Sequence, residues 1–497
     1  MRRSIRIAAG VVGILAGVGC ALYLIQGLSA RSALAGYKAR LRQQGEKLKL
    51  SELASPPTTD PKFVAANAVL AGYAIAPRME SLEMMRYDAP AKVHLEWRGD
   101  SAVWASPNTN SSWVEFDRQM AAAEPALAQM RSALENPPPD GGWVWTDDQD
   151  RNLVNNVSHG LARDRVLSQT LRNAAIAALH HDDLDGARKN LHALAELARM
   201  NRNEVMFVSQ MVRAAVAGVG LDATWQALQH RGWDEMRLAV LQHDWEGLDL
   251  IVAAERGVEG ERANSQAFMA KVRRTKPNEL QAMLGVRAVA SPSSPSAPRS
   301  GPRSLVATIE AKLKPRLYKR FGMDADELYQ LQHETVVVNA VRSLETNRPW
   351  PEVNRVLTNL YDLMDREIGP DRFDRYLVSA LIIPNAARPA RVAVVTETQR
   401  RLTIADIAIM RYQAGHGVAP KNLEALVPEF LAAVPIDPMS GKALRYRLNS
   451  DGSFVLYSVG EDGIDDGCDP SPRSAGDTPG LWEGKDAVWP TAAEPGW

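Results

Sequence analysis

The sequence contains few of the residues from which small cofactor sites are built. Two cysteines, Cys20 and Cys468, occur in 497 residues, which is too few for a disulfide scaffold or for a cysteine-built zinc or iron–sulfur site. The 58 basic and 59 acidic residues nearly cancel, so the chain offers no overall positive charge to a phosphate backbone. We therefore expect no nucleic-acid partner.

Common catalytic motifs are missing as well. The sequence has no phosphate loop, no dinucleotide-binding glycine motif after a strand, no G-x-S-x-G nucleophile turn and no H-E-x-x-H zinc motif. The run from His180 to Asp183 cannot converge on one ion, because adjacent helical residues point about 100° apart. We expect these four residues to form a turn at a helix end. Because the common catalytic motifs are missing, we expect a protein that is not an enzyme.

A long stretch without charge follows the first residues. Arg2, Arg3 and Arg6 precede a run of 24 uncharged residues that ends at Ala30. As a helix this run would extend about 36 Å, enough to cross a hydrocarbon core of about 30 Å. The pattern favours an uncleaved transmembrane signal anchor over residues 1–30. A cleaved signal peptide and a lipid-modified Cys20 are the alternatives.

Small residues recur on one face of this expected span, and they suggest a partner for it. Gly13, Gly17 and Ala21 are spaced four residues apart, a spacing that lets two membrane helices approach closely. The alternatives are a homodimer through this face and a membrane helix that is merely rich in small residues.

The rest of the chain is expected to be mainly helical, with breaks at proline-rich segments. Helical periodicity and loop composition divide it into the following segments: juxtamembrane helices and aromatic-rich loops over 31–150, a helical body over 151–289, a Pro/Ser-rich linker over 290–304, a second helical segment over 305–400, and a C-terminal α+β module over 401–497. Within the body, small and apolar residues stripe two successive helices around residues 171–194, as in one tetratricopeptide-like hairpin. With no second copy of this repeat, a helical bundle is expected.

Two alternating segments near the C-terminus predict a β-hairpin, and an acidic loop follows it. The strands are residues 443–449 and 454–460, joined by an Asp-Gly turn. The acidic loop, residues 461–469, carries five carboxylates and two glycines. Calcium prefers six to eight oxygen ligands, so the loop is either a calcium site or a solvated turn. It is not an EF-hand, because Arg473 would stand where the bidentate glutamate belongs.

Residues 401–490 resemble the C-terminal module of the major pseudopilin of type II secretion. The shared features, in order, are "HGVAPKNLEALV", "VPIDPMSGKALRY", "FVLYSVGEDGIDDG" and "KDAVW". The resemblance implies a calcium ion held by Asp462, Asp466 and Asp486, with Asp465 and Asp469 as alternates. It stops at this module, because the N-terminus lacks the peptidase site and the acidic residue of a pseudopilin.

These observations predict a mainly α protein with an N-terminal transmembrane helix, a helical bundle and a small pseudopilin-like module. More Lys and Arg follow the span than precede it, which favours a cytoplasmic body. The short N-terminal tail and the resemblance favour a single-pass protein of the bacterial inner membrane with a periplasmic body, which is our prediction. We expect a protein-binding or scaffolding role with an unidentified envelope partner. The alternatives are an accessory component of a type II secretion or type IV pilus-like system, and an envelope hydrolase without a recognisable motif.

Overall fold

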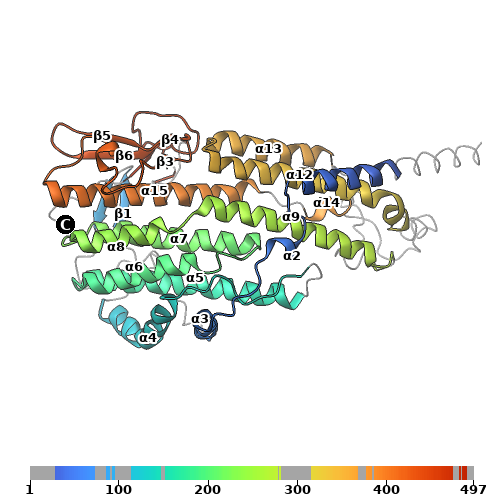
Figure 1. The fold of residues 1–497 in the computed structure, drawn as a ribbon. Helices are drawn as coiled ribbons and strands as arrows, with labels where there is room; N and C mark the ends of the chain where they lie inside the picture. Colours follow the sequence, from blue (N-terminus) through green and yellow to red (C-terminus); the bar gives the residue numbers. More distant parts are fainter. Residues whose placement is uncertain are drawn as a thin grey trace, which may run out of the picture.

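The computed structural model shows an elongated helical body with small sheets at one end (Figure 1). It describes residues 28–72, 85–89, 92–95, 113–146, 151–277, 279–280, 315–367, 376–382, 386–473, 481–482 and 484–489. The mainly α prediction is confirmed, as are small antiparallel sheets in the C-terminal part.

A helix over residues 28–43 opens the described part of the chain. The further α-helices are α2 (Leu50–Leu53), α3 (Pro61–Ala71), α4 (Trp113–Leu134), α5 (Arg151–His180), α6 (Leu184–Arg199), α7 (Phe207–Leu228), α8 (Glu235–Glu246), α9 (Leu250–Arg274), α12 (Met323–Arg342), α13 (Trp350–Glu367), α14 (Ser379–Ile382) and α15 (Ala387–His416). Short π- and 3₁₀-helices lie at Tyr318–Gly322, Ser343–Thr346 and Leu423–Leu426.

The strands form three small antiparallel sheets. Strand β1 (Met85–Ala89) pairs with β2 (Lys92–Leu95), and β3 (Ile436–Asp437) pairs with β4 (Lys442–Ala443). The third sheet has the order β5 (Arg445–Leu448), β6 (Phe454–Ser458), β7 (Ala487–Val488). The predicted C-terminal hairpin is therefore confirmed as β5–β6. The β1–β2 ladder lies in the segment where we expected helices and loops.

Local sequence signals place several helix ends. The Asp183 carboxylate accepts a hydrogen bond from the Gly186 amide at 2.8 Å and caps α6, and Asp234 caps α8 in the same way. The turn predicted after α5 is confirmed, with Asp182 in the left-handed region. Gly417 ends α15 at φ 75°, a conformation that favours glycine.

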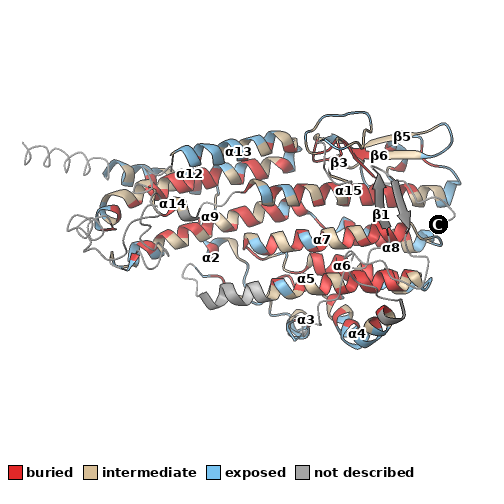
Figure 2. Ribbon diagram, turned by 180° about the vertical axis from the view of Figure 1, so that it is seen from behind, coloured by how far each residue is buried: buried red, intermediate tan, exposed pale blue. Residues whose placement is uncertain are grey.

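The helices stack in layers, with buried residues where the layers meet (Figure 2), and apolar side chains form the core between them. At the end that carries the sheets, α15 lies between the β5–β6 hairpin and helices α7 and α8 (Figure 1). Helices α5 and α6 form the next layer and pack on each other, which confirms the predicted helical hairpin. Trp245 is fully buried in this core, and its Nε1–H donates to Thr224 Oγ1 at 3.0 Å.

The C-terminal strands share a core with the bundle. Trp489, one residue after β7, is buried, and its ring meets that of Trp225 of α7 edge-to-face, with centroids 6.2 Å apart. Helix α15 continues without a break through residue 401, where we expected the module to begin. The strands therefore rest on a helix that also belongs to the bundle.

The opposite end of the body carries the helix over residues 28–43. Its Leu34 and Leu41 are buried in one cluster with Leu331 of α12, and the helix lies at the end away from the sheets (Figure 1). Among the helices of the described residues, none combines the length and the apolar character needed to cross a membrane. Residues 1–27 lie outside the described residues, and so do Gly13, Gly17, Ala21 and the expected linker at 290–304.

Candidate functional site

Asp486, the residue before β7, holds the acidic loop through hydrogen bonds from the loop's backbone amides. One Asp486 oxygen accepts a hydrogen bond from the Asp466 amide at 3.3 Å. The other accepts from the amides of Cys468 and Asp469, at 2.8 and 2.9 Å. Asp486 is buried, and burial raises the pKa of its carboxyl although the three amides oppose the shift. This aspartate therefore organises the loop through its backbone.

The other two predicted calcium ligands lie on the outside of the loop. Asp462 and Asp466 are exposed, and Asp462 accepts a hydrogen bond from the Ile464 amide at 3.0 Å. The structure thus brings the Asp466 backbone to Asp486 and places Asp462 in a turn of its own. Calcium binding by these three residues remains a prediction.

The remaining loop carboxylates have cationic partners that the sequence analysis missed. Asp465 accepts hydrogen bonds from Arg445 Nε at 2.8 Å and from the Tyr457 hydroxyl at 3.0 Å. Lys485 lies 2.8 Å from Asp469, and this hydrogen bond lowers the pKa of the Asp469 carboxyl. One signal was present in the sequence: Arg445 and Tyr457 are register partners of the predicted hairpin, so their side chains share one face.

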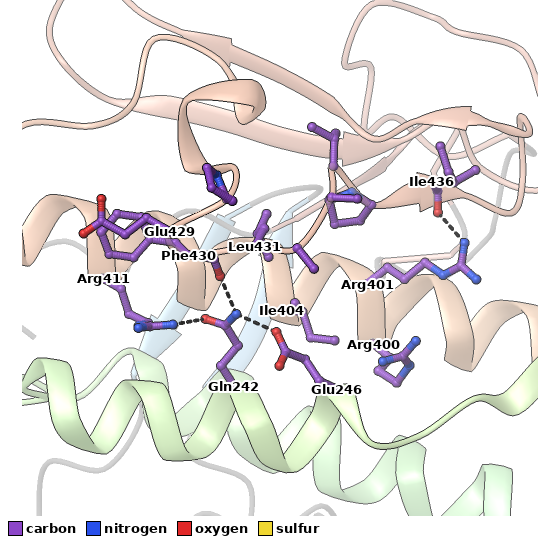
Figure 3. Close-up of a pocket in the computed structure, with 15 residues that line it drawn as sticks. Gln242, Glu246, Arg400, Arg401, Ile404, Arg411, Glu429, Phe430, Leu431 and Ile436 are labelled. Atoms are coloured by element: carbon purple, nitrogen blue, oxygen red, sulfur yellow. Dashed lines mark hydrogen bonds between the residues drawn. The ribbon is translucent and has the colours of Figure 1, made fainter.

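A second feature is a groove between α8, α15 and the chain that follows the short helix at Leu423–Leu426 (Figure 3). Its volume is about 630 Å³, within the range of ligand-binding pockets. We call residues 428–436 the rim segment, because they form one side of the groove. The floor includes Ile404 of α15, and Leu431 and Val434 of the rim add apolar surface.

Hydrogen bonds fix the rim segment to both helices (Figure 3). Gln242 of α8 donates through Nε2 to the Phe430 carbonyl at 2.7 Å and accepts from Arg411 at 3.0 Å. At the other end, Arg401 donates to the Ile436 carbonyl at 2.8 Å. The groove is therefore a formed feature of the surface, held at both ends.

The arginines that line the groove are all paired. Arg400 and Arg401 both bind Glu397, whose carboxylate is fully buried. Burial opposes the charge on Glu397, but the two guanidinium groups outweigh it and lower the pKa of this carboxyl. Arg411 binds Glu235 at 2.7 Å. The two carboxylates offset two of these three positive charges, and two further glutamates line the groove, which presents hydrogen-bonding edges around an apolar centre.

A third feature joins α6 to α8, and we call it the α6–α8 cluster. Its members are His192 and Glu196, one turn apart on α6, and Asp244 on α8. Their ligand atoms lie within 4.8 Å of one another, the one such group of three among the described residues. The hydrogen bond that His192 donates to Asp244 is the main cause of a raised pKa of His192, and burial raises the pKa of Glu196.

Comparisons with known proteins return no match to a family model, a curated protein or a solved structure. The resemblance to pseudopilins therefore stays a prediction. The function of this protein has to be inferred from the geometry of its own chain.

Proposed function

We propose that this protein is a non-enzymatic scaffold, anchored in the bacterial inner membrane at one end and binding a partner protein at the other. The observation that carries the proposal is the groove, which lies on the end of the body away from the helix over residues 28–43. That helix directly follows the expected membrane anchor, so the bundle would hold the groove away from the bilayer. Helix α15 alone, with 30 residues, extends about 45 Å.

The chemistry of the groove supports a protein ligand. Val434 and the edges of the otherwise buried Ile404 and Leu431 form a small apolar centre, which suits an apolar side chain of a partner. The surrounding carbonyl, amide and paired guanidinium groups suit hydrogen bonds to its backbone. Because the arginines already have carboxylate partners, a highly charged ligand such as a phosphate is disfavoured. The occupant we propose is a loop or chain end of an envelope protein.

Photo-crosslinking from within the groove tests this proposal. A photoreactive amino acid is placed at Ala433, an exposed residue of the rim, and in a matched variant at Ala122, an exposed residue of α4. We expect one discrete protein adduct from position 433 in intact cells, and less of it when Gln242→Ala removes the hydrogen bond that holds the Phe430 carbonyl of the rim segment. Identical adducts from both positions, or none from position 433, would contradict the proposal.

The proposal includes a calcium ion at the acidic loop, bound through Asp462, Asp466 and Asp486. Support comes from Asp486, which already fixes the loop backbone from one side. A bound ion would take further carboxylate ligands from Asp462 and Asp466 on the exposed side of the loop. Its role would be to stabilise the module that carries the rim segment.

A further inference from the structure

The α6–α8 cluster contains a buried carboxylate. Asp244 is only 2% exposed, and its Oδ1 lies 2.9 Å from His192 Nδ1. Its Oδ2 is buried and has no hydrogen-bond partner among the described residues, a property it shares with Glu204 Oε2 and Glu334 Oε2; unlike them, Asp244 belongs to a group of three possible metal ligands. A buried carboxylate oxygen without a partner costs free energy of about 1–3 kcal/mol or more, so this oxygen calls for a ligand that the protein atoms do not supply.

His192 and Glu196 of α6 each place a ligand atom within 4.8 Å of a carboxylate oxygen of Asp244. His192 and Glu196 are four residues apart, so their side chains lie one above the other on one face of α6. Glu196 is buried, whereas the His192 side chain is 38% exposed and leaves the cluster open to solvent on one side. An ion could therefore enter without unfolding the bundle.

We propose that His192, Glu196 and Asp244 bind a divalent transition-metal ion, with Zn²⁺ as the ion that best fits. One imidazole and two carboxylates are ligands that zinc accepts, and three protein ligands leave a fourth position for water. In a tetrahedral site with bonds of about 2.1 Å, the ligand atoms are separated by about 3.4 Å. The present separations of 2.9 Å for the His192–Asp244 pair and at most 4.8 Å overall require shifts on the order of 1 Å.

Arg199 completes the surroundings of the site. Its guanidinium binds Glu196 and donates to the backbone carbonyls of His243 and Asp244 at the end of α8. A partner outside the ligand set that orients a ligating carboxylate is typical of metal sites. Its positive charge offsets one of the two carboxylates, so the site without an ion carries a charge of −1, which attracts a cation.

The simpler alternative is an ion-pair network that only joins two helices. It explains the contacts of His192 with Asp244 and of Arg199 with Glu196. It leaves Asp244 Oδ2 without a partner among the described residues, and a bound ion would supply one. The two interpretations differ in a measurable way, because an ion-pair network has no specific affinity for zinc.

Metal titration of the full-length protein, purified in detergent and stripped with a chelator, tests the proposal. We expect one Zn²⁺ per chain, and visible absorption typical of tetrahedral Co²⁺ when cobalt is the probe. His192→Ala should weaken zinc binding by at least about 100-fold, since loss of a mere supporting contact already costs 10- to 100-fold. The matched control is His243→Ala, which removes an exposed imidazole next to Asp244 and should bind zinc as the unaltered protein does.

Asp244→Asn provides a second test that keeps the shape of the side chain. It should lose zinc to a similar degree, and a melting curve in chelator confirms that each variant is folded. If the unaltered protein binds no zinc at micromolar concentration, the proposal is wrong. It is equally wrong if a folded His192→Ala or Asp244→Asn variant retains full affinity, because the zinc would then lie elsewhere.

Discussion

Asp486→Asn should release the acidic loop, because this one carboxylate holds three of its backbone amides. Two of the amides, those of Cys468 and Asp469, converge on a single oxygen at 2.8 and 2.9 Å. An asparagine can present its oxygen to one side only, and its NH₂ group then faces amide donors on the other.

The expected size follows from the hydrogen bonds lost. A hydrogen bond to a charged group contributes about 1.5–3 kcal/mol, and about 1.4 kcal/mol corresponds to a factor of ten. Amide hydrogen exchange should therefore accelerate by about 10- to 100-fold, in a calcium chelator, at whichever of the Asp466, Cys468 and Asp469 amides lose their acceptor oxygen. This acceleration can be measured by hydrogen–deuterium exchange of a peptide that covers the acidic loop.

The control for this prediction is Asp462→Asn, which alters an exposed carboxylate that accepts one amide, that of Ile464. Exchange at Cys468 and Asp469 should stay unchanged in this variant. Unchanged exchange in Asp486→Asn would refute the assignment of Asp486 as the organiser of the loop. Added calcium should slow exchange in the unaltered protein; if it does not, the calcium proposal fails while the hydrogen-bond argument stands.

Two further predictions concern stability. A Cβ at Gly260 would lie 1.6 Å from the Val205 carbonyl oxygen, so Gly260→Ala should destabilise the bundle by about 3 kcal/mol or more. Gly36 has open space around it, so Gly36→Ala should instead stabilise its helix by about 0.5–1 kcal/mol. Melting curves that rank the two variants in the reverse order would contradict this. Burial raises the pKa of Glu204 from 4.5 to about 7, so the folded state holds this proton more tightly than the unfolded state. The free energy of unfolding should then fall by up to about 3 kcal/mol as pH rises from 4.5 through 7. In Glu204→Gln, denaturant titrations at several pH values should show a free energy of unfolding that lacks this decrease.

Much of the secondary structure could be predicted because its signals are local. The end of α15 follows from Gly417, whose positive φ disfavours other residues. The β5–β6 hairpin follows from period-two alternation around an Asp-Gly turn. The β1–β2 ladder (Met85–Ala89 with Lys92–Leu95) was missed, because its short strands lie in a polar, aromatic-rich stretch without clear alternation.

The candidate sites depended on contacts between residues far apart in the chain. Gln242 reaches the Phe430 carbonyl across 188 positions, and no sequence period brings α8 to the rim segment. His192 and Asp244 each lie on a helix where a charged residue normally marks a solvated face. The burial of Asp244 and its contact with His192 arise only when α6 packs against α8.

The sequence by itself determined the helices, their caps and the hairpin, because each depends on the conformational preferences of a few neighbouring residues. It also marked the acidic loop, residues 461–469, as unusual. Tertiary packing alone decided which carboxylates are buried and what faces them. Asp486 accepts hydrogen bonds from three amides, whereas one Asp244 oxygen has no partner among the described residues. The physical reason is that burial and charge pairing are properties of surfaces in contact, and these surfaces come from segments that the local sequence cannot bring together.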